Sequence, residues 1–158
     1  MFYTRYQSSI APIILAGDED GLSRVYFDVP EAKEKLKIPP EWTENEAFFA
    51  DIIKQLDEYF AGKRKKFDVK LNLKGTKYQK KIWNLLAEIP YGQTLTYSEI
   101  AKTSGNAKAA RAVGGANGKN PVPVIVPCHR VVGTKNDLTG FAFGVDIKEK
   151  LITLERGS

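Results

Sequence analysis

The sequence has very few of the residues that crosslink or ligate small proteins. Its 158 residues include one cysteine, Cys128, and one histidine, His129. A single cysteine cannot form an internal disulfide, and two adjacent side chains do not complete a zinc site, which usually takes four ligands. Disulfide-stapled secreted domains and zinc-finger folds are therefore excluded. No cofactor motif is visible either, so we expect neither a metal nor a cofactor.

Long apolar runs are also missing. No stretch approaches the roughly 20 apolar residues that cross a bilayer. Residues 1–20 lack the basic start and long apolar run of a signal peptide. The composition, 42% hydrophobic and 27% charged, is typical of an ordinary globular protein. We therefore expect a cytoplasmic protein of one or two small domains with no membrane partner.

Positive charge is concentrated in the second half of the chain. Residues 1–74 carry 12 Lys and Arg against 13 Asp and Glu, whereas residues 75–158 carry 12 against 6. This imbalance indicates a polyanionic partner for the second half, although charge alone favours a solvated basic surface equally. A linker near Leu73–Gly75 divides the chain into an N-terminal α/β domain, residues 1–74, and a C-terminal domain, residues 75–158.

Strand and helix signals both occur in the first half. The apolar run 12–16 and the partly alternating run 24–29 flank Asp20-Gly21, which is typical of a tight hairpin turn. Farther on, Thr43 and Glu46 have the spacing of a capping box. They predict a helix with Thr43 as N-cap, with apolar residues at helical spacing from Phe48 to Phe60 and a stop at Gly62.

The second half predicts a pair of short helices. Capping boxes at 76–79 and 96–99 each precede helical periodicity. The second of these helices ends at Gly105, and Asn106 is the expected N-cap of a helix over 107–116. Two short helices across a glycine-containing turn are a helix-turn-helix candidate, although many helix pairs in protein cores share this pattern.

The helix over 107–116 is almost entirely Ala and Gly, with Arg111 as its one long side chain after Lys108. Small residues by themselves favour tight helix packing. They also fit a helix that enters the minor groove of DNA, which is about 6 Å wide. In that arrangement Arg111 enters the duplex at the place that a base has left.

The most informative segment precedes and includes Cys128. Residues 124–126 predict a short buried strand bounded by prolines. The adjacent Cys128 and His129 at its exit indicate thiol chemistry, because a nearby base raises the reactive thiolate fraction. Glu155, on a last helix that starts near Asp146, is a candidate to orient the histidine. A cysteine protease also uses a thiol, an imidazole and an acid, but no protease cleft signature accompanies these residues.

Five segments closely resemble the O6-alkylguanine-DNA alkyltransferases. They are Ile89-Pro90-Tyr91-Gly92, Thr96-Tyr97, Ala110-Arg111-Ala112-Val113-Gly114, Asn120-Pro121 and Pro127-Cys128-His129-Arg130-Val131. The resemblance implies an α/β (α+β) fold. A ribonuclease-H-like N-terminal domain would precede a mainly helical C-terminal domain of winged-helix, or helix-turn-helix-like, type.

The resemblance also implies a role for each matching residue. Cys128 corresponds to the alkyl-accepting cysteine, and His129, acting through a water, and Glu155 correspond to the partners that deprotonate it. Asn120 corresponds to an asparagine that bonds within the site, and Tyr97 to the tyrosine that helps rotate the phosphate and donates to guanine. The other matches are Ser98, Asn106, Ala110, Arg111 and Gly114 for DNA, and Val131, Ala142 and Lys148 for the substrate base.

The implied function is direct repair of O6-alkylguanine, together with O4-alkylthymine, in duplex DNA. The protein would flip the base from the minor-groove side and transfer its alkyl group to Cys128 once, as a monomer. Ala142 is among the residues expected beside the substrate base, and its methyl side chain offers the base no hydroxyl. The alternative is a non-enzymatic module that recognises alkyl damage, but proteins of that kind typically lack the cysteine.

Overall fold

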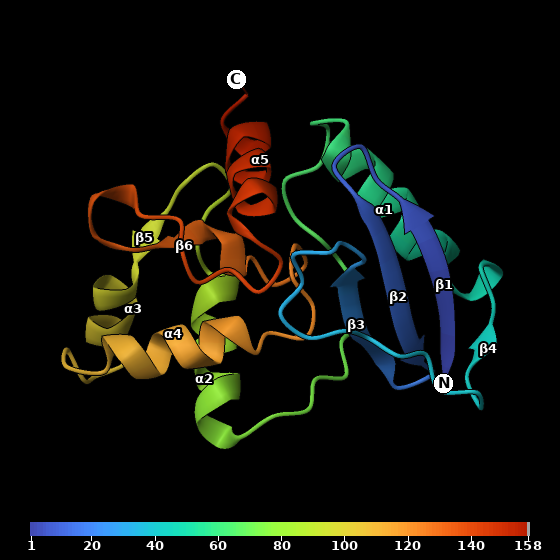
Figure 1. The fold of residues 1–158 in the computed structure, drawn as a ribbon, viewed down its shortest axis with the longest axis horizontal. Helices are drawn as coiled ribbons and strands as arrows, with labels where there is room; N and C mark the ends of the chain where they lie inside the picture. Colours follow the sequence, from blue (N-terminus) through green and yellow to red (C-terminus); the bar gives the residue numbers. More distant parts are fainter. Residues whose placement is uncertain (158) are drawn as a thin grey trace.

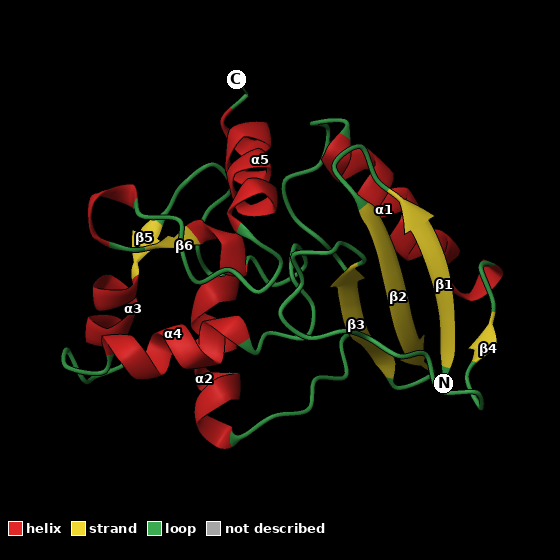
Figure 2. Ribbon diagram, in the orientation of Figure 1, coloured by secondary structure: helices red, strands yellow, loops and turns green. Residues whose placement is uncertain are grey.

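The computed structural model describes residues 1–157, which form two lobes side by side (Figure 1). The first lobe is a four-stranded sheet in the order β3-β2-β1-β4 with helix α1 on one face (Figure 2). Its elements are β1 (Phe2–Gln7), β2 (Pro12–Asp18), β3 (Gly21–Phe27), β4 (Thr43–Glu44), the short 3₁₀ helix η1 (Ala47–Phe49) and α1 (Ala50–Phe60).

The second lobe is mainly helical, with one small parallel pair of strands, β5 and β6. Its elements are α2 (Lys77–Ala87), β5 (Leu95–Thr96), α3 (Tyr97–Thr103), α4 (Ala110–Gly118), η2 (Cys128–Arg130), β6 (Val131–Val132), η3 (Thr134–Asn136) and α5 (Val145–Arg156). None of the helices in residues 1–157 has the length and apolar character needed to span a membrane.

The predicted hairpin is present, whereas the predicted start of the first helix is wrong. Strands β2 and β3 pair antiparallel across the Asp20-Gly21 turn. Thr43 does not cap a helix, because it pairs with Phe2 as part of β4. Asn45 takes the capping role instead, and its Oδ1 accepts a hydrogen bond from the amide of Phe48 at 3.1 Å.

Helix α1 ends as the sequence predicts. Gly62 has a φ of 76°, a conformation that glycine adopts without strain. Its amide donates to the carbonyl of Tyr59 at 2.9 Å, and the amide of Lys63 donates to Glu58 at 2.8 Å. These two bonds form a Schellman motif, which satisfies the last carbonyls of the helix.

Both capping boxes in the second lobe are confirmed, and α3 packs against α4 as a helix-turn-helix pair would. Asn106 is not the N-cap of α4, however. Its Oδ1 accepts from the amide of Lys108 at 3.1 Å, and this closes a turn before the helix. Helix α4 therefore begins only at Ala110, after the N-cap Ala109.

Residues 124–126 do not form the predicted strand. Val124 has a φ of 75°, and the amide of Val126 donates to the carbonyl of Val122 at 2.9 Å, so the chain makes a tight turn. Flanking prolines have no amide hydrogen for a strand ladder, which explains the difference. The apolar pattern still reports burial, because the side chains of Val122, Val124 and Val126 are buried.

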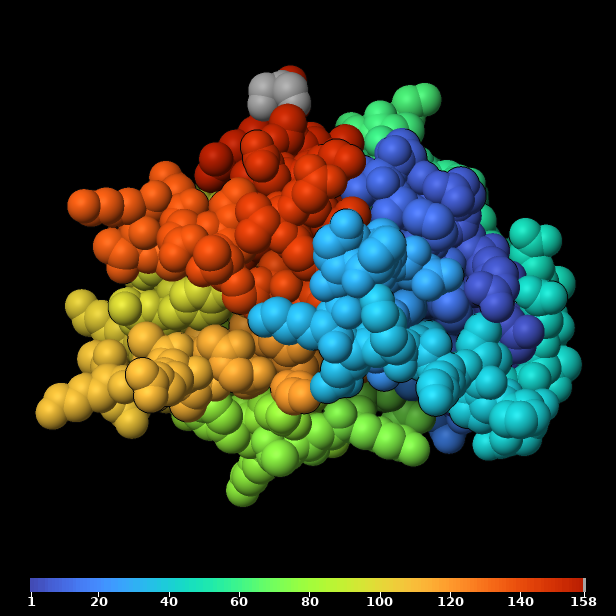
Figure 3. Space-filling view, viewed as in Figure 1, coloured from blue at the N-terminus to red at the C-terminus, as the bar shows by residue number. Residues whose placement is uncertain are grey.

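The two lobes share one hydrophobic core. The amide of Val25 in β3 donates to the carbonyl of Pro121 at 2.9 Å, and the amide of Lys33 donates to Ala142 at 2.8 Å. Phe143 packs against Phe27 with 5.4 Å between ring centroids. Figure 3 shows the light-blue segment of the N-terminal lobe lying directly against the orange-red end of the chain. The first lobe therefore supports loops that belong to the second.

Thr96→Ala tests how much the capping box of α3 contributes. The Thr96 side chain accepts from the amide of Glu99 at 3.1 Å, and a lost N-cap costs about 1 kcal/mol. We expect the free energy of unfolding, measured by urea denaturation, to fall by about that amount. Thr103→Ala at the other end of the same helix is the matched control. An equal fall in both variants would contradict the assignment of the cap.

Candidate active site and nucleic-acid interface

Cys128 lies in a buried turn between the two lobes. It opens η2, directly after the Val122–Val126 turn, and 4% of the residue is exposed. Asn120 holds this turn in shape, since its Nδ2 donates to the carbonyl of Val126 at 2.8 Å and its Oδ1 accepts from the amide of Val122 at 3.0 Å. Asn120 therefore links the end of α4 to the backbone that carries the thiol.

The carboxylate of Glu155 organises the residues beside the thiol. Its Oε2 lies 2.7 Å from Nε2 of His129, the residue that the sequence makes Glu155 a candidate to orient. Arg130 donates to both oxygens, from Nε at 2.7 Å and from Nη2 at 3.0 Å. Tyr59 donates from its hydroxyl to Oε2 at 2.5 Å. The His129 and Glu155 side chains are 0% and 2% exposed, so this network is buried.

Electrostatics in the site follow from this burial. Burial by itself raises the pKa of Glu155, but the hydrogen bonds from His129, Arg130 and Tyr59 outweigh it and hold the pKa far below the ordinary range. Burial also lowers the pKa of His129, which favours neutral imidazole. Because the carboxylate faces Nε2, that nitrogen carries the proton, and the buried Nδ1 is left without a partner.

The thiol of Cys128 is not a thiolate in the resting protein. Burial raises its pKa to about 11, although a hydrogen bond from Asn120 and the charge of Lys148 act in the opposite direction. Lys148 is itself fully buried, and its ammonium nitrogen lies 5.7 Å from the ring centroid of Tyr97. Burial lowers the pKa of Lys148 to about 8. The thiol therefore needs a base before it can react.

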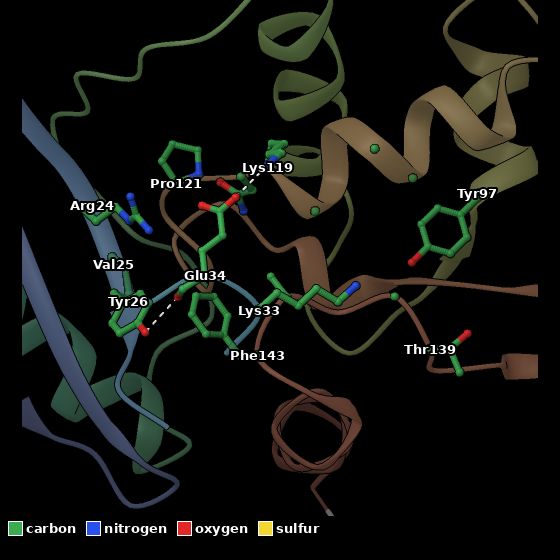
Figure 4. Close-up of a pocket in the computed structure, with 16 residues that line it drawn as sticks. Arg24, Val25, Tyr26, Lys33, Glu34, Tyr97, Lys119, Pro121, Thr139 and Phe143 are labelled. Atoms are coloured by element: carbon green, nitrogen blue, oxygen red, sulfur yellow. Dashed lines mark hydrogen bonds and ion pairs between the residues drawn. The ribbon is translucent and has the colours of Figure 1, made fainter. Parts of the chain in front are cut away.

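A cavity of about 460 Å³ opens between the lobes (Figure 4), and Asn120, which holds the turn before Cys128, is among the residues that line it. From the second lobe it is lined by Tyr97, Gly114, Asn120 and Ala142, and from the first by Arg24 and Lys33. An ion pair of 2.8 Å between Glu34 and Lys119 joins the lobes at this cavity. Its dimensions suit a planar base that has left a duplex.

A second groove, of about 440 Å³, lies over α3 and α4. It brings together most of the residues that the sequence predicts for DNA, namely Tyr97, Ser98, Ala110, Arg111 and Gly114. Tyr97 lines both the groove and the cavity. Asn106 does not line the groove and lies exposed in the turn between the two helices. Val131 is buried in β6 beside the reactive turn.

Two groups of the network were not predicted from sequence. Arg130 lies inside the recognised motif, but nothing in the motif indicates a pair with Glu155. Tyr59 lies 96 residues from Glu155 and in the other lobe, and no local pattern connects them. Asn117 was also missed, and its Nδ2 donates to the carbonyl of Cys128 at 3.4 Å. Such contacts arise only from tertiary packing, within the second lobe for Arg130 and Asn117 and between the lobes for Tyr59.

A groove over paired helices is joined through one tyrosine to a cavity lined by Asn120, the residue that holds the turn of the buried cysteine. This arrangement defines a DNA-binding protein with a thiol reaction centre. Comparison with known proteins specifies the family. Residues 77–157 match the family described as 6-O-methylguanine DNA methyltransferase, DNA binding domain, and residues 1–73 match the ribonuclease-like domain of the same proteins.

Full-length relatives give the same result. A methylated-DNA–protein-cysteine methyltransferase of Methanosarcina acetivorans is 56% identical over 155 residues, which are 98% of each protein. One from Mycolicibacterium paratuberculosis is 44% identical over 98% of this chain and 92% of that protein. The crystal structure of Mycobacterium tuberculosis OGT in complex with DNA matches with a TM-score of 0.90 and 42% identity, covering 99% of this chain and 94% of that one. The chain belongs to the methylated-DNA–protein-cysteine methyltransferase family, and its expected fold class is confirmed.

Glu155→Gln tests the energetics of the buried network. The native carboxyl has a pKa below that of the unfolded chain, about 4.3, so its stabilisation is present above that pH and is lost as the pH falls further. Removing one charge of a buried pair costs about 3 kcal/mol. We expect urea denaturation to show that deficit at pH 7 and a smaller one at pH 3.

Glu149→Gln, at an exposed position of the same helix, is the control and should change stability little at either pH. A deficit in Glu155→Gln that stays constant from pH 7 to pH 3 would show that the network does not depend on an ionised Glu155.

Proposed function

We propose that the protein directly reverses alkylation of guanine in duplex DNA by moving the alkyl group from O6 to Sγ of Cys128. Family membership gives the reaction class, transfer from methylated DNA to a protein cysteine. The observation that carries the assignment to these residues is the bond between His129 Nε2 and Glu155. It leaves Nδ1 without a hydrogen-bond partner, on the residue that follows the only cysteine of the chain.

The reaction balances without a cofactor. His129 takes the thiol proton through a water at Nδ1, and Glu155 stabilises the resulting imidazolium. The thiolate attacks the alkyl carbon, so that an S–C bond forms while the C–O6 bond breaks. The guanine leaves as an anion and takes a proton from Tyr97, and the proton that His129 took from the thiol is returned to Tyr97 through solvent, so that both residues end as they began. The product is a thioether that water does not readily cleave, so each protein molecule reacts once.

The two hollows support base flipping from the minor-groove side. O6 lies inside the base stack, so the nucleotide must leave the duplex before the thiol can reach it. In this proposal, α4 enters the minor groove with its small residues Ala110 and Gly114, and Arg111 fills the vacated position. Ser98 and Asn106 contact the DNA backbone. The base then enters the cavity past Tyr97, which belongs to both hollows.

The proposal assigns recognition of the base mainly to backbone groups. The carbonyls of Cys128 and Val131 accept the guanine amino group, and Asn120 holds the turn that presents them. Ala142 and Lys148 adjoin the base. Because thymine has a similar alkylated oxygen, O4-alkylthymine belongs to the proposed substrates. Residues 75–158 carry the chemistry, and residues 1–74 form the supporting domain.

The same chemistry bears on where the protein acts and in what state. A reaction that consumes one reduced thiol belongs in a compartment that keeps thiols reduced, which supports the cytoplasm. Cys128, His129, Glu155 and the DNA groove all come from one chain, which supports action as a monomer.

Intact-protein mass spectrometry after incubation with a duplex that carries O6-methylguanine tests the proposal. We expect a stoichiometric gain of one methyl group, mapped to Cys128 and absent from Cys128→Ala. Binding to the damaged duplex without any gain in mass would instead support a recognition module without transfer.

Arg111→Ala tests base flipping. Without this side chain, the gap left by the flipped nucleotide is not filled, and the cost of unstacking, a few kcal/mol, is no longer offset. We expect single-turnover repair of duplex DNA to slow at least tenfold while reaction with the free base O6-benzylguanine continues at the original rate. Equal loss on both substrates would contradict an intercalating role for Arg111.

A further inference from the structure

Tyr59 is the one residue of the N-terminal lobe that donates a hydrogen bond to the acid of the reactive network. It lies on α1, while Glu155 lies on α5 in the other lobe (Figure 1). Its ring is 0% exposed and packs among Phe60, Phe67 and Tyr91. Its hydroxyl donates to Oε2 of Glu155 at 2.5 Å.

The contacts of Glu155 show what this hydroxyl contributes. Oε2 accepts from Tyr59, from His129 and from Nη2 of Arg130, and Oε1 accepts from Nε of Arg130 and, at 3.4 Å, from the amide of Gly92. A carboxylate has about four acceptor positions, so these donors occupy essentially all of them. The carboxylate can neither rotate freely nor take the Nε2 proton of His129.

We propose that Tyr59 is a positioning residue for alkyl transfer, holding Glu155 so that the carboxylate fixes His129 with Nε2 protonated and Nδ1 free. This rests on the proposed function for its biological meaning, but its physical content concerns the reactivity of Cys128. The hydroxyl restrains the carboxylate from α1, in the first lobe, whereas His129 and Arg130 hold it from η2 in the second. It also draws negative charge away from the imidazole, because it shares Oε2 with His129.

The sign of the electrostatic effect follows from that sharing. Without the hydroxyl, Glu155 interacts more strongly with a protonated His129, so the pKa of His129 rises. The other titratable groups around the pair are Tyr91 from the loop after α2, Arg130 and Cys128 from η2, and Lys148 from α5. Tyr59→Phe leaves all of them in place. Only neutral imidazole accepts the thiol proton, so the rate should begin to fall at a higher pH than before.

Tyr59→Phe is the test, with two readouts on the full-length protein. The first is the rate of alkyl transfer from O6-benzylguanine, and the second is the rate at which iodoacetamide alkylates Cys128, followed by intact mass across pH. The single cysteine makes the mass change unambiguous. We expect both rates to fall about tenfold, as for loss of a hydrogen bond to a charged group. The acid limb of the pH profile should move upward by roughly half a pH unit.

A matched control separates this effect from loss of stability. Tyr6 also donates to a carboxylate of α1, at 2.6 Å to Asp57, in a hydrogen bond that is exposed to solvent. Tyr6→Phe should leave both rates and the pH profile unchanged. Thermal denaturation of each variant shows whether it is folded at the temperature of the assay.

Combination with Glu155→Gln gives the decisive comparison. If Tyr59 acts through Glu155, Tyr59→Phe has no further effect on the iodoacetamide rate in the Glu155→Gln background. An equal loss in both backgrounds, or an unchanged acid limb, overturns the proposal. The iodoacetamide readout needs no alkylguanine. A wild-type protein that accepts no alkyl group from DNA would therefore refute the proposed function while leaving the role of Tyr59 open to support or refutation by this comparison.

Discussion

The rest of the structure depends on one buried carboxylate. An ionised Glu155 with a side chain 2% exposed is tolerable only if donors compensate for the water it has lost. Those donors come from η2, which supplies His129 and Arg130, and from α1 in the other lobe, which supplies Tyr59. The lobes must therefore dock in one arrangement for the charge to be satisfied. A well-packed apolar group would often be at least as stable in such a place, which indicates that the charge is kept for its effect on His129.

The resting state of the thiol follows from the same burial. Reactive cysteines commonly have lowered pKa values, yet burial raises the pKa of Cys128 to about 11. A protonated thiol is a poor target for oxidants and for adventitious alkylating agents. Under the proposed one-time transfer to Cys128, any side reaction of this thiol consumes the molecule. In the proposed reaction, the unpartnered Nδ1 of His129 accepts the thiol proton and the buried ammonium of Lys148 stabilises the thiolate, so that the thiolate forms only during reaction.

Sequence signals for helix caps and stops were reliable where the hydrogen bonds that satisfy them lie within the same helix end. The boxes at Thr76 and Thr96 and the stop at Gly62 involve atoms three or four residues apart, and all three are confirmed. Thr43 has the same local pattern, but pairing with β1 took its place. Family resemblance matched His129 and Glu155 to the partners that deprotonate the cysteine, and the structure brings these two side chains into contact. Tyr59 carries no comparable signal, because its role arises from packing between segments 96 residues apart.

The N-terminal lobe thus also stabilises loops that belong to the DNA-binding domain. The exposed ion pair of Glu34 and Lys119 contributes little by itself, since solvent screens it. The buried contacts matter more. The amide of Val25 bonds to Pro121 next to Asn120, and the amide of Lys33 bonds to Ala142 in the loop that walls the cavity. Each of these loops would otherwise expose unpaired backbone and sample several conformations. The first lobe thus fixes the turn after Asn120, the loop at Ala142 and the carboxylate of Glu155. It preorganises the site, although the reacting residue, Cys128, belongs to the second lobe.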